Sequence, residues 1–174
     1  MPEHPSDTSA GRTPKPPAEA ALAERTEAAR YDTATLGTVL GFDPGARTIG
    51  VAVGEALLGS ARALSCLRAD DGLPRWAEVD ALLAEWSPQL LLVGLPRHAD
   101  GSDSNSTQTA RRLSRALEAR YALPVATVDE RLSSHEATQR LEARSPSRRR
   151  SQRNADRLHA EAAAVIVETF LAQI

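Results

Sequence analysis

Three short apolar runs joined by tight turns constrain the fold of this chain most. The runs read TVLGFD, TIGVAVGE and LLGSARALS, and they follow one another between residues 38 and 65. Each run is rich in apolar or β-branched residues, and turn signals such as Pro44-Gly45 separate them. The connections are too short to hold a helix, so the sequence predicts a three-stranded antiparallel meander.

Helical and apolar segments alternate after the meander. Residues 89–96, QLLLVGLP, form a continuous apolar run, which is typical of a strand buried on both faces. Residues 123–130, LPVATVDE, predict a further strand. Helices are expected at 74–86, near 105–121, in SSHEATQRLEA and at about 155–172. Asp71 is a plausible cap for the first of these helices, and Asn105 or Ser106 for the second.

Strands that alternate with helices after a meander predict an α/β fold with a mixed five-stranded sheet and helices on both faces. The last helix should bury one stripe, made of Leu158, Ala162, Val165, Ile166 and Thr169. Residues 1–36 carry five prolines within their first twenty positions and show little apolar periodicity. We expect a disordered tail there and one folded domain at 37–174.

Composition excludes several classes of protein. A formal net charge of -2 argues against indiscriminate coating of nucleic acid, although it allows a local basic site. The single Cys66 provides no disulfide framework. Neither a signal peptide nor a membrane-spanning apolar run is recognisable, so the sequence predicts a soluble cytoplasmic protein with no membrane partner.

Two carboxylates stand where predicted strands end. Asp43 closes the first strand, and Asp129-Glu130 close the last one. Side chains alternate along a strand, so only one of the latter two can share a site with Asp43. Both positions also have structural interpretations, because Asp43 and Asp129 can each stabilise a turn and Glu130 can pair with a nearby arginine.

The segments GFDPGARTIGVAVGE, LLLVGLPRHADGS, VDERLSSHEA and AAAVIVETFL resemble the YqgF family, the pre-16S ribosomal RNA nucleases also described as Holliday junction resolvase-like proteins. The resemblance covers about residues 38 to 172. It implies an RNase H-like nuclease domain, which agrees with the order of elements derived above.

The resemblance also implies a two-metal-ion phosphodiester hydrolase, an endo- or exonuclease, with Asp43 and Glu130 as metal ligands. At the position of the family's third acid this chain has His159, with Asp156 as a possible substitute one turn earlier. Carboxylates suit Mg²⁺ or Mn²⁺, and an imidazole ligand favours Mn²⁺. His159 is alternatively a proton carrier or an ordinary helix residue.

Basic residues indicate a nucleic-acid partner. Residues 143–157 hold six arginines against one acid, and a flexible basic loop beside metal ions can contact phosphates. The candidate contacts are Arg47, Arg131, Arg148, Arg149, Arg150 and Arg153. We expect an enzyme that processes the 5' end of pre-16S ribosomal RNA during ribosome biogenesis and is a monomer or weak dimer. A DNA junction resolvase or a catalytically weakened nucleic-acid binding protein is the alternative.

Overall fold

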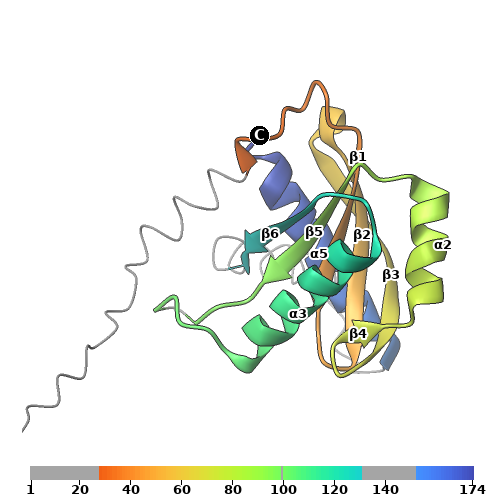
Figure 1. The fold of residues 1–174 in the computed structure, drawn as a ribbon, viewed down its shortest axis with the longest axis vertical. Helices are drawn as coiled ribbons and strands as arrows, with labels where there is room; N and C mark the ends of the chain where they lie inside the picture. The colour runs from red at the N-terminus through yellow and green to blue at the C-terminus, as the bar shows by residue number, and fades with distance from the viewer. Residues whose placement is uncertain (1–27, 99, 131–151) are drawn as a thin grey trace, which may run out of the picture.

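The computed structural model describes residues 28–98, 100–130 and 152–174, and within these ranges a six-stranded mixed sheet forms the centre of the protein (Figure 1). Across the sheet the strands are β4 (Leu73–Pro74), β3 (Ser60–Asp70), β2 (Thr48–Glu55), β1 (Thr38–Pro44), β5 (Leu90–Leu95) and β6 (Val125–Asp129). The antiparallel meander of β1, β2 and β3 is confirmed, and β5 and β6 continue the sheet in parallel. The sixth strand, β4, is a two-residue addition to the five expected.

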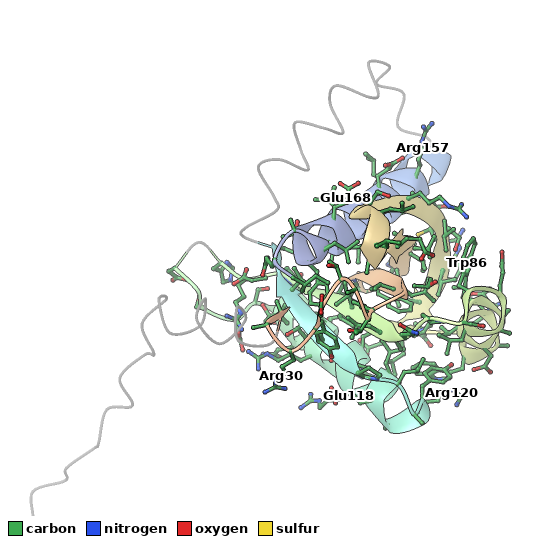
Figure 2. All side chains as sticks on the ribbon, turned by 90° about the horizontal axis from the view of Figure 1, so that it is seen from above. Arg30, Trp86, Glu118, Arg120, Arg157 and Glu168 are labelled. Atoms are coloured by element: carbon green, nitrogen blue, oxygen red, sulfur yellow. The ribbon has the colours of Figure 1, made fainter. Side chains whose placement is uncertain are left out.

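Helices cover both faces of this sheet (Figure 1). One apolar cluster joins the sheet to α2 (Trp76–Trp86) and α3 (Asn105–Arg120), and a second joins it to α5 (Gln152–Leu171). Seen from above, Glu168 of α5 and Glu118 of α3 lie on opposite sides (Figure 2). The expected α/β class is therefore confirmed, in agreement with the RNase H-like fold that the resemblance implies. In the described ranges, no helix is long and apolar enough to span a membrane.

The start of α3 is held by a capping box. The Ser104 hydroxyl accepts a hydrogen bond from the Thr107 backbone N–H at 3.1 Å, and the Thr107 hydroxyl accepts one from the Ser104 N–H at 2.8 Å. These reciprocal bonds satisfy two backbone donors that a helix start would otherwise leave unpaired. The cap expected at Asn105 or Ser106 thus lies slightly earlier in the chain.

The expected cap of α2 is wrong. The helix begins after Arg75, with no hydrogen bond from a capping side chain. Asp71 instead occupies the turn between β3 and β4 with a φ of 48°, and its carboxylate pairs with Arg112 of α3. Sequence alone did not show the two-residue strand β4, which moves Asp71 away from the helix start.

The buried stripe of α5 is only partly the expected one. Val165 and Ile166 are buried as predicted, but Leu158 is 48% exposed. Alanines occupy the centre of the buried helix face instead. The strands under the helix present glycines to it, and a Cβ at Gly50 would lie 1.9 Å from the backbone oxygen of His159. Apolar periodicity favours Leu over Ala, so it does not predict a helix–sheet contact that requires small side chains.

The folded part of the chain begins before residue 37. Ala28 and Leu36 are buried in the same apolar cluster as α5, and the Tyr31 ring packs edge-on against Phe170 with centroids 5.7 Å apart. Residues 28–36, which the sequence assigned to the tail, therefore cover part of the core. The disorder expected for the preceding 27 residues lies outside the described residues, as does the helix expected in SSHEATQRLEA.

Candidate active site

Asp43 lies near the end of β1 and points to the α5 face of the sheet. Its strand partner in β2 is Gly50, where the absence of a side chain lets the α5 backbone approach at His159. The Asp43 side chain is 15% exposed and lies 2.9 Å from the Nδ1 atom of His159 through its Oδ2 atom. The glycine in β2 thus sets how closely the helix brings its imidazole to the carboxylate.

His159 is shifted toward its charged form. Its pKa is raised chiefly by the hydrogen bond to Asp43, and the charges of Asp43 and Asp156 act in the same direction against the opposing effect of burial. Asp156 therefore lies near enough to act on His159 through its charge, as expected for a residue one turn earlier on one helix face. When the imidazole is protonated, it forms an ion pair with Asp43.

Glu130 follows directly after β6, and its side chain lies between β5 and α5. A Cβ at Gly94 of β5 would lie 2.4 Å from the Glu130 Oε1 atom and 2.4 Å from the Ile166 Cδ1 atom. Burial, then the charges of Asp43 and Asp129, raise the pKa of Glu130 to about 7. This carboxylate is therefore largely buried, packed against Gly94, and lies near the charges of Asp43 and Asp129.

Asp43 and Glu130 share one face of the sheet. Along β6, Ala126 and Val128 belong to the apolar cluster under α5, so alternation places Glu130 on that face as well. The hydrogen bond to His159 of α5 places Asp43 there too. Two strands that are not adjacent, β1 and β6, thus direct acids toward the same helix across β5, where Gly94 leaves room.

Three residues near this site escaped sequence analysis. Cys66 of β3 is the strand partner of Gly50. The pKa of its thiol is raised by burial and by the charge of Asp156, while a hydrogen bond with Thr48 lowers it. Arg68 lies two residues further along β3 and acts on the same thiol through its charge. These residues reach the site only through the register of β2 and β3, so no sequence motif predicted them.

Most of the expected nucleic-acid contacts lie outside the described residues. Arg47 lies exposed on the β1–β2 turn, and its backbone oxygen accepts a hydrogen bond from the Ala69 N–H at 2.9 Å. Arg131, Arg148, Arg149 and Arg150 lie outside the described residues, as does the side chain of Arg153 in α5. Of the six expected contacts, the structure places one, close to the end of β1.

The donor set suits a hard divalent cation. Burial and then the charge of Asp43 raise the pKa of Glu130, and a cation between the two carboxylates would oppose both effects. Within the described residues, no three His, Cys, Asp or Glu side chains are already grouped as a metal site. Mg²⁺ is commonly held by one or two carboxylates, with water and substrate phosphates as its other ligands. Asp43 and Glu130 fit that pattern.

Comparison with known proteins gives one family and many relatives. The family model described as "RuvX: Holliday junction resolvase" matches residues 37–173. A Xanthomonas euvesicatoria protein named "Putative pre-16S rRNA nuclease" is 46% identical over 136 residues, covering 78% of this chain and 88% of the relative. A protein of the same name from Azotobacter vinelandii is 44% identical over 135 residues, covering 78% and 93%.

One solved structure among those similar to this chain is "T. thermophilus RuvC in complex with Holliday junction substrate". It is 17% identical, with a TM-score of 0.46, and the match covers 78% of this chain and 94% of that one.

Proposed function

The chain belongs to the RuvX family, and from that premise we propose that it is a metal-dependent nuclease that processes the 5' end of pre-16S ribosomal RNA during ribosome biogenesis. The observation that carries this proposal is the pair of carboxylates, Asp43 and Glu130, on the α5 face of the sheet. Relatives that share nearly half of their residues with this chain are named for that RNA.

Asp43 and Glu130 would hold the metal through their carboxylate oxygens. A bound divalent ion activates water and stabilises the leaving oxygen of an in-line phosphodiester displacement. The chain's own contribution is to fix the acids: Gly50 sets the approach of α5 to Asp43, and Gly94 accommodates Glu130. These contacts place both groups before any substrate arrives, which is how a site avoids reorganisation during reaction.

His159 stands where the resemblance expects the third acid. We propose that its imidazole completes the ligand set or holds Asp43 in place, with Asp156 as the substitute carboxylate. The Nδ1 atom is 2.9 Å from Asp43, so the second function needs no rearrangement. Ligation by His159 would favour Mn²⁺ over Mg²⁺.

Arginines would provide the contacts to the substrate backbone. Arg47 lies on the turn that follows Asp43 and is exposed. We propose that it contacts phosphates together with Arg131, Arg148, Arg149, Arg150 and Arg153. Phosphate contacts orient a nucleic acid without reading its sequence. We expect a cytoplasmic protein that is a monomer or weak dimer.

The test compares three substrates: a pre-16S RNA fragment, an unrelated RNA and a four-way DNA junction, each with Mg²⁺ and with Mn²⁺. Wild-type protein should cut the pre-16S RNA in a metal-dependent way, and Asp43→Asn should abolish cutting while the protein stays folded. The asparagine keeps the shape of the side chain and removes the charge that a cation needs.

The second candidate is a junction resolvase, which the description of the family model favours. Cleavage of the DNA junction and neither RNA would replace the proposed substrate with this one. Binding of RNA without cleavage in either metal would show a nucleic-acid binding protein that has lost its chemistry.

A further inference from the structure

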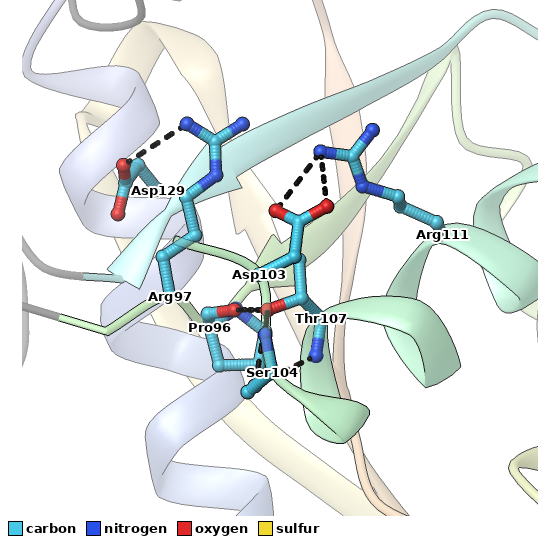
Figure 3. Close-up of polar contacts among 7 residues, drawn as sticks. All are labelled: Pro96, Arg97, Asp103, Ser104, Thr107, Arg111 and Asp129. Carbon is cyan, nitrogen blue, oxygen red and sulfur yellow. Dashed lines mark hydrogen bonds and ion pairs between the residues drawn. The ribbon is translucent and has the colours of Figure 1, made fainter. Parts of the chain in front are cut away.

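Arg97 and Asp129 form a nearly buried ion pair next to the candidate site. The Arg97 Nη1 atom lies 3.7 Å from the Asp129 Oδ2 atom, and the two side chains are 14% and 1% exposed (Figure 3). Asp129 ends β6, and Arg97 follows two residues after β5. A charge buried this deeply is costly when its partner is removed, so the pair ties the ends of two neighbouring strands together.

The pair lies on the opposite face of the sheet from Asp43. Along β5, Leu91, Val93 and Leu95 belong to the apolar cluster under α3, and Val125 of β6 packs against the same cluster. Alternation places Asp129 on that face as well, whereas Glu130, the next residue, points to the α5 face. Asp129, which pairs with Arg97, and Glu130, the candidate metal ligand, are therefore consecutive residues on opposite faces of the sheet.

Arg97 is itself held in place by the start of α3. The backbone oxygen of Pro96, the preceding residue, accepts a hydrogen bond from the Thr107 hydroxyl, and Thr107 is part of the capping box with Ser104 (Figure 3). Arg97 also forms an isolated backbone bridge with Asp103. The backbone of Arg97 is therefore fixed, and its guanidinium reaches from there to Asp129.

We propose that Arg97 is a positioning residue, which holds Asp129 on the α3 face and thereby fixes where Glu130 stands on the α5 face. The inference rests on the proposed function, because it takes Glu130 as part of the nuclease site. A small rotation at the end of β6 would move Glu130 away from Asp43, and partners behind metal ligands commonly contribute about 10- to 100-fold to metal affinity or activity.

The test separates positioning from stability by removing both charges at once. Arg97→Met alone removes one ion-pair partner of a buried carboxylate, and that variant is expected to be less stable. The double variant Arg97→Met/Asp129→Asn loses both charges of the pair and should melt near the wild-type temperature. We nevertheless expect kcat to fall about tenfold or more with KM unchanged, and Mn²⁺ affinity, measured by calorimetry, to fall about tenfold.

Two further variants serve as rescue and control. Arg97→Lys keeps the charge and should recover part of kcat. Arg111→Met removes an exposed ion pair with Asp103, 3.2 Å long, from the same loop and helix. Exposed pairs contribute little, so that variant should keep wild-type kcat. A fall in kcat for Arg111→Met equal to that of the double variant would assign the effect to the loop and overturn the role of Arg97.

The outcomes also distinguish this inference from the proposed function. In the metal-free protein, the NOE contacts of the Glu130 side chain with Gly94 and Ile166 should weaken in the double variant, and those within β1 should stay unchanged. Chemical shifts alone do not serve, because Asp129→Asn alters the residue next to Glu130. The NOE readout decides the position of Glu130 even if the wild type neither cleaves RNA nor binds Mn²⁺, a result that would overturn the proposed function alone. Wild-type kcat with unchanged NOE contacts of Glu130, or a raised KM with unchanged kcat, would overturn the positioning role.

Discussion

Glu130 destabilises the fold when it ionises without a cation nearby. Its pKa rises from the ordinary 4.5 to about 7, so the native state binds a proton more tightly than the unfolded chain. Stability should therefore fall as pH increases from about 4.5 to about 7, by at most about 3 kcal/mol. Glu130→Gln should melt higher than the wild type at pH 8 in EDTA and equally at pH 4, by calorimetry. Wild type that is as stable as the variant at pH 8 would contradict this.

His159 allows a second comparison at the scale of single residues. If its imidazole is a metal ligand, His159→Asp should improve cleavage with Mg²⁺ because it supplies a harder oxygen donor, and His159→Ala should be poorly active with either metal. If Asp156 is the ligand, Asp156→Asn should be the damaging change and His159→Ala should be mild. Cleavage rates of these variants in both metals decide, and equal rates in all would place the third ligand elsewhere.

At the scale of elements, the site depends on how α5 lies on β2. A Cβ at Gly50 would meet backbone atoms of His159 at 1.9 and 2.2 Å, and backbone cannot rotate out of the way. Gly50→Ala should therefore shift α5, destabilise the protein by about 1–3 kcal/mol in urea and abolish most cleavage. Gly54→Ala is the matched control on the same strand: it meets the Val167 side chain at 2.4 Å. It should lose stability but keep cleavage per folded molecule.

The elements also show what the sequence was able to predict. The meander and the buried strand β5 followed from local patterns, as did the acids at the ends of β1 and β6. The role of Asp43 and Glu130 as metal ligands came from the resemblance and stays a prediction. The contacts of Arg97 and Cys66 did not follow from local patterns, because they join strands whose register no local pattern specifies. Leu158 was misplaced because apolar periodicity ranks side chains by hydrophobicity, whereas the α5 contact selects for small size.

At the scale of the molecule, exposed arginines should orient the substrate. Arg47 lies on the β1–β2 turn and Arg68 on β3 beside the site, and both are exposed. Changing both to Gln should reduce the salt dependence of RNA binding by about 1.4 in the log–log slope, at about 0.7 per phosphate contact. The matched control changes Arg30 and Arg115, which are exposed; Arg30 lies across the molecule from Arg157 of α5 (Figure 2). An equal loss of salt dependence in the control variant would show that the overall charge attracts RNA, without defined contacts from Arg47 and Arg68.

The order in which the chain is made gives the pairing of Asp43 with His159 a further meaning. The two residues are 116 positions apart, and α5, which carries His159 and covers the Asp43 face of the sheet, is synthesised after every strand that the structure describes. Synthesis runs from the N-terminus and a domain generally folds as a unit, so β1 emerges well before the helix that pairs with it. A growing chain therefore exposes the acid of β1 without its helix. The candidate site is therefore completed only after α5 has been synthesised.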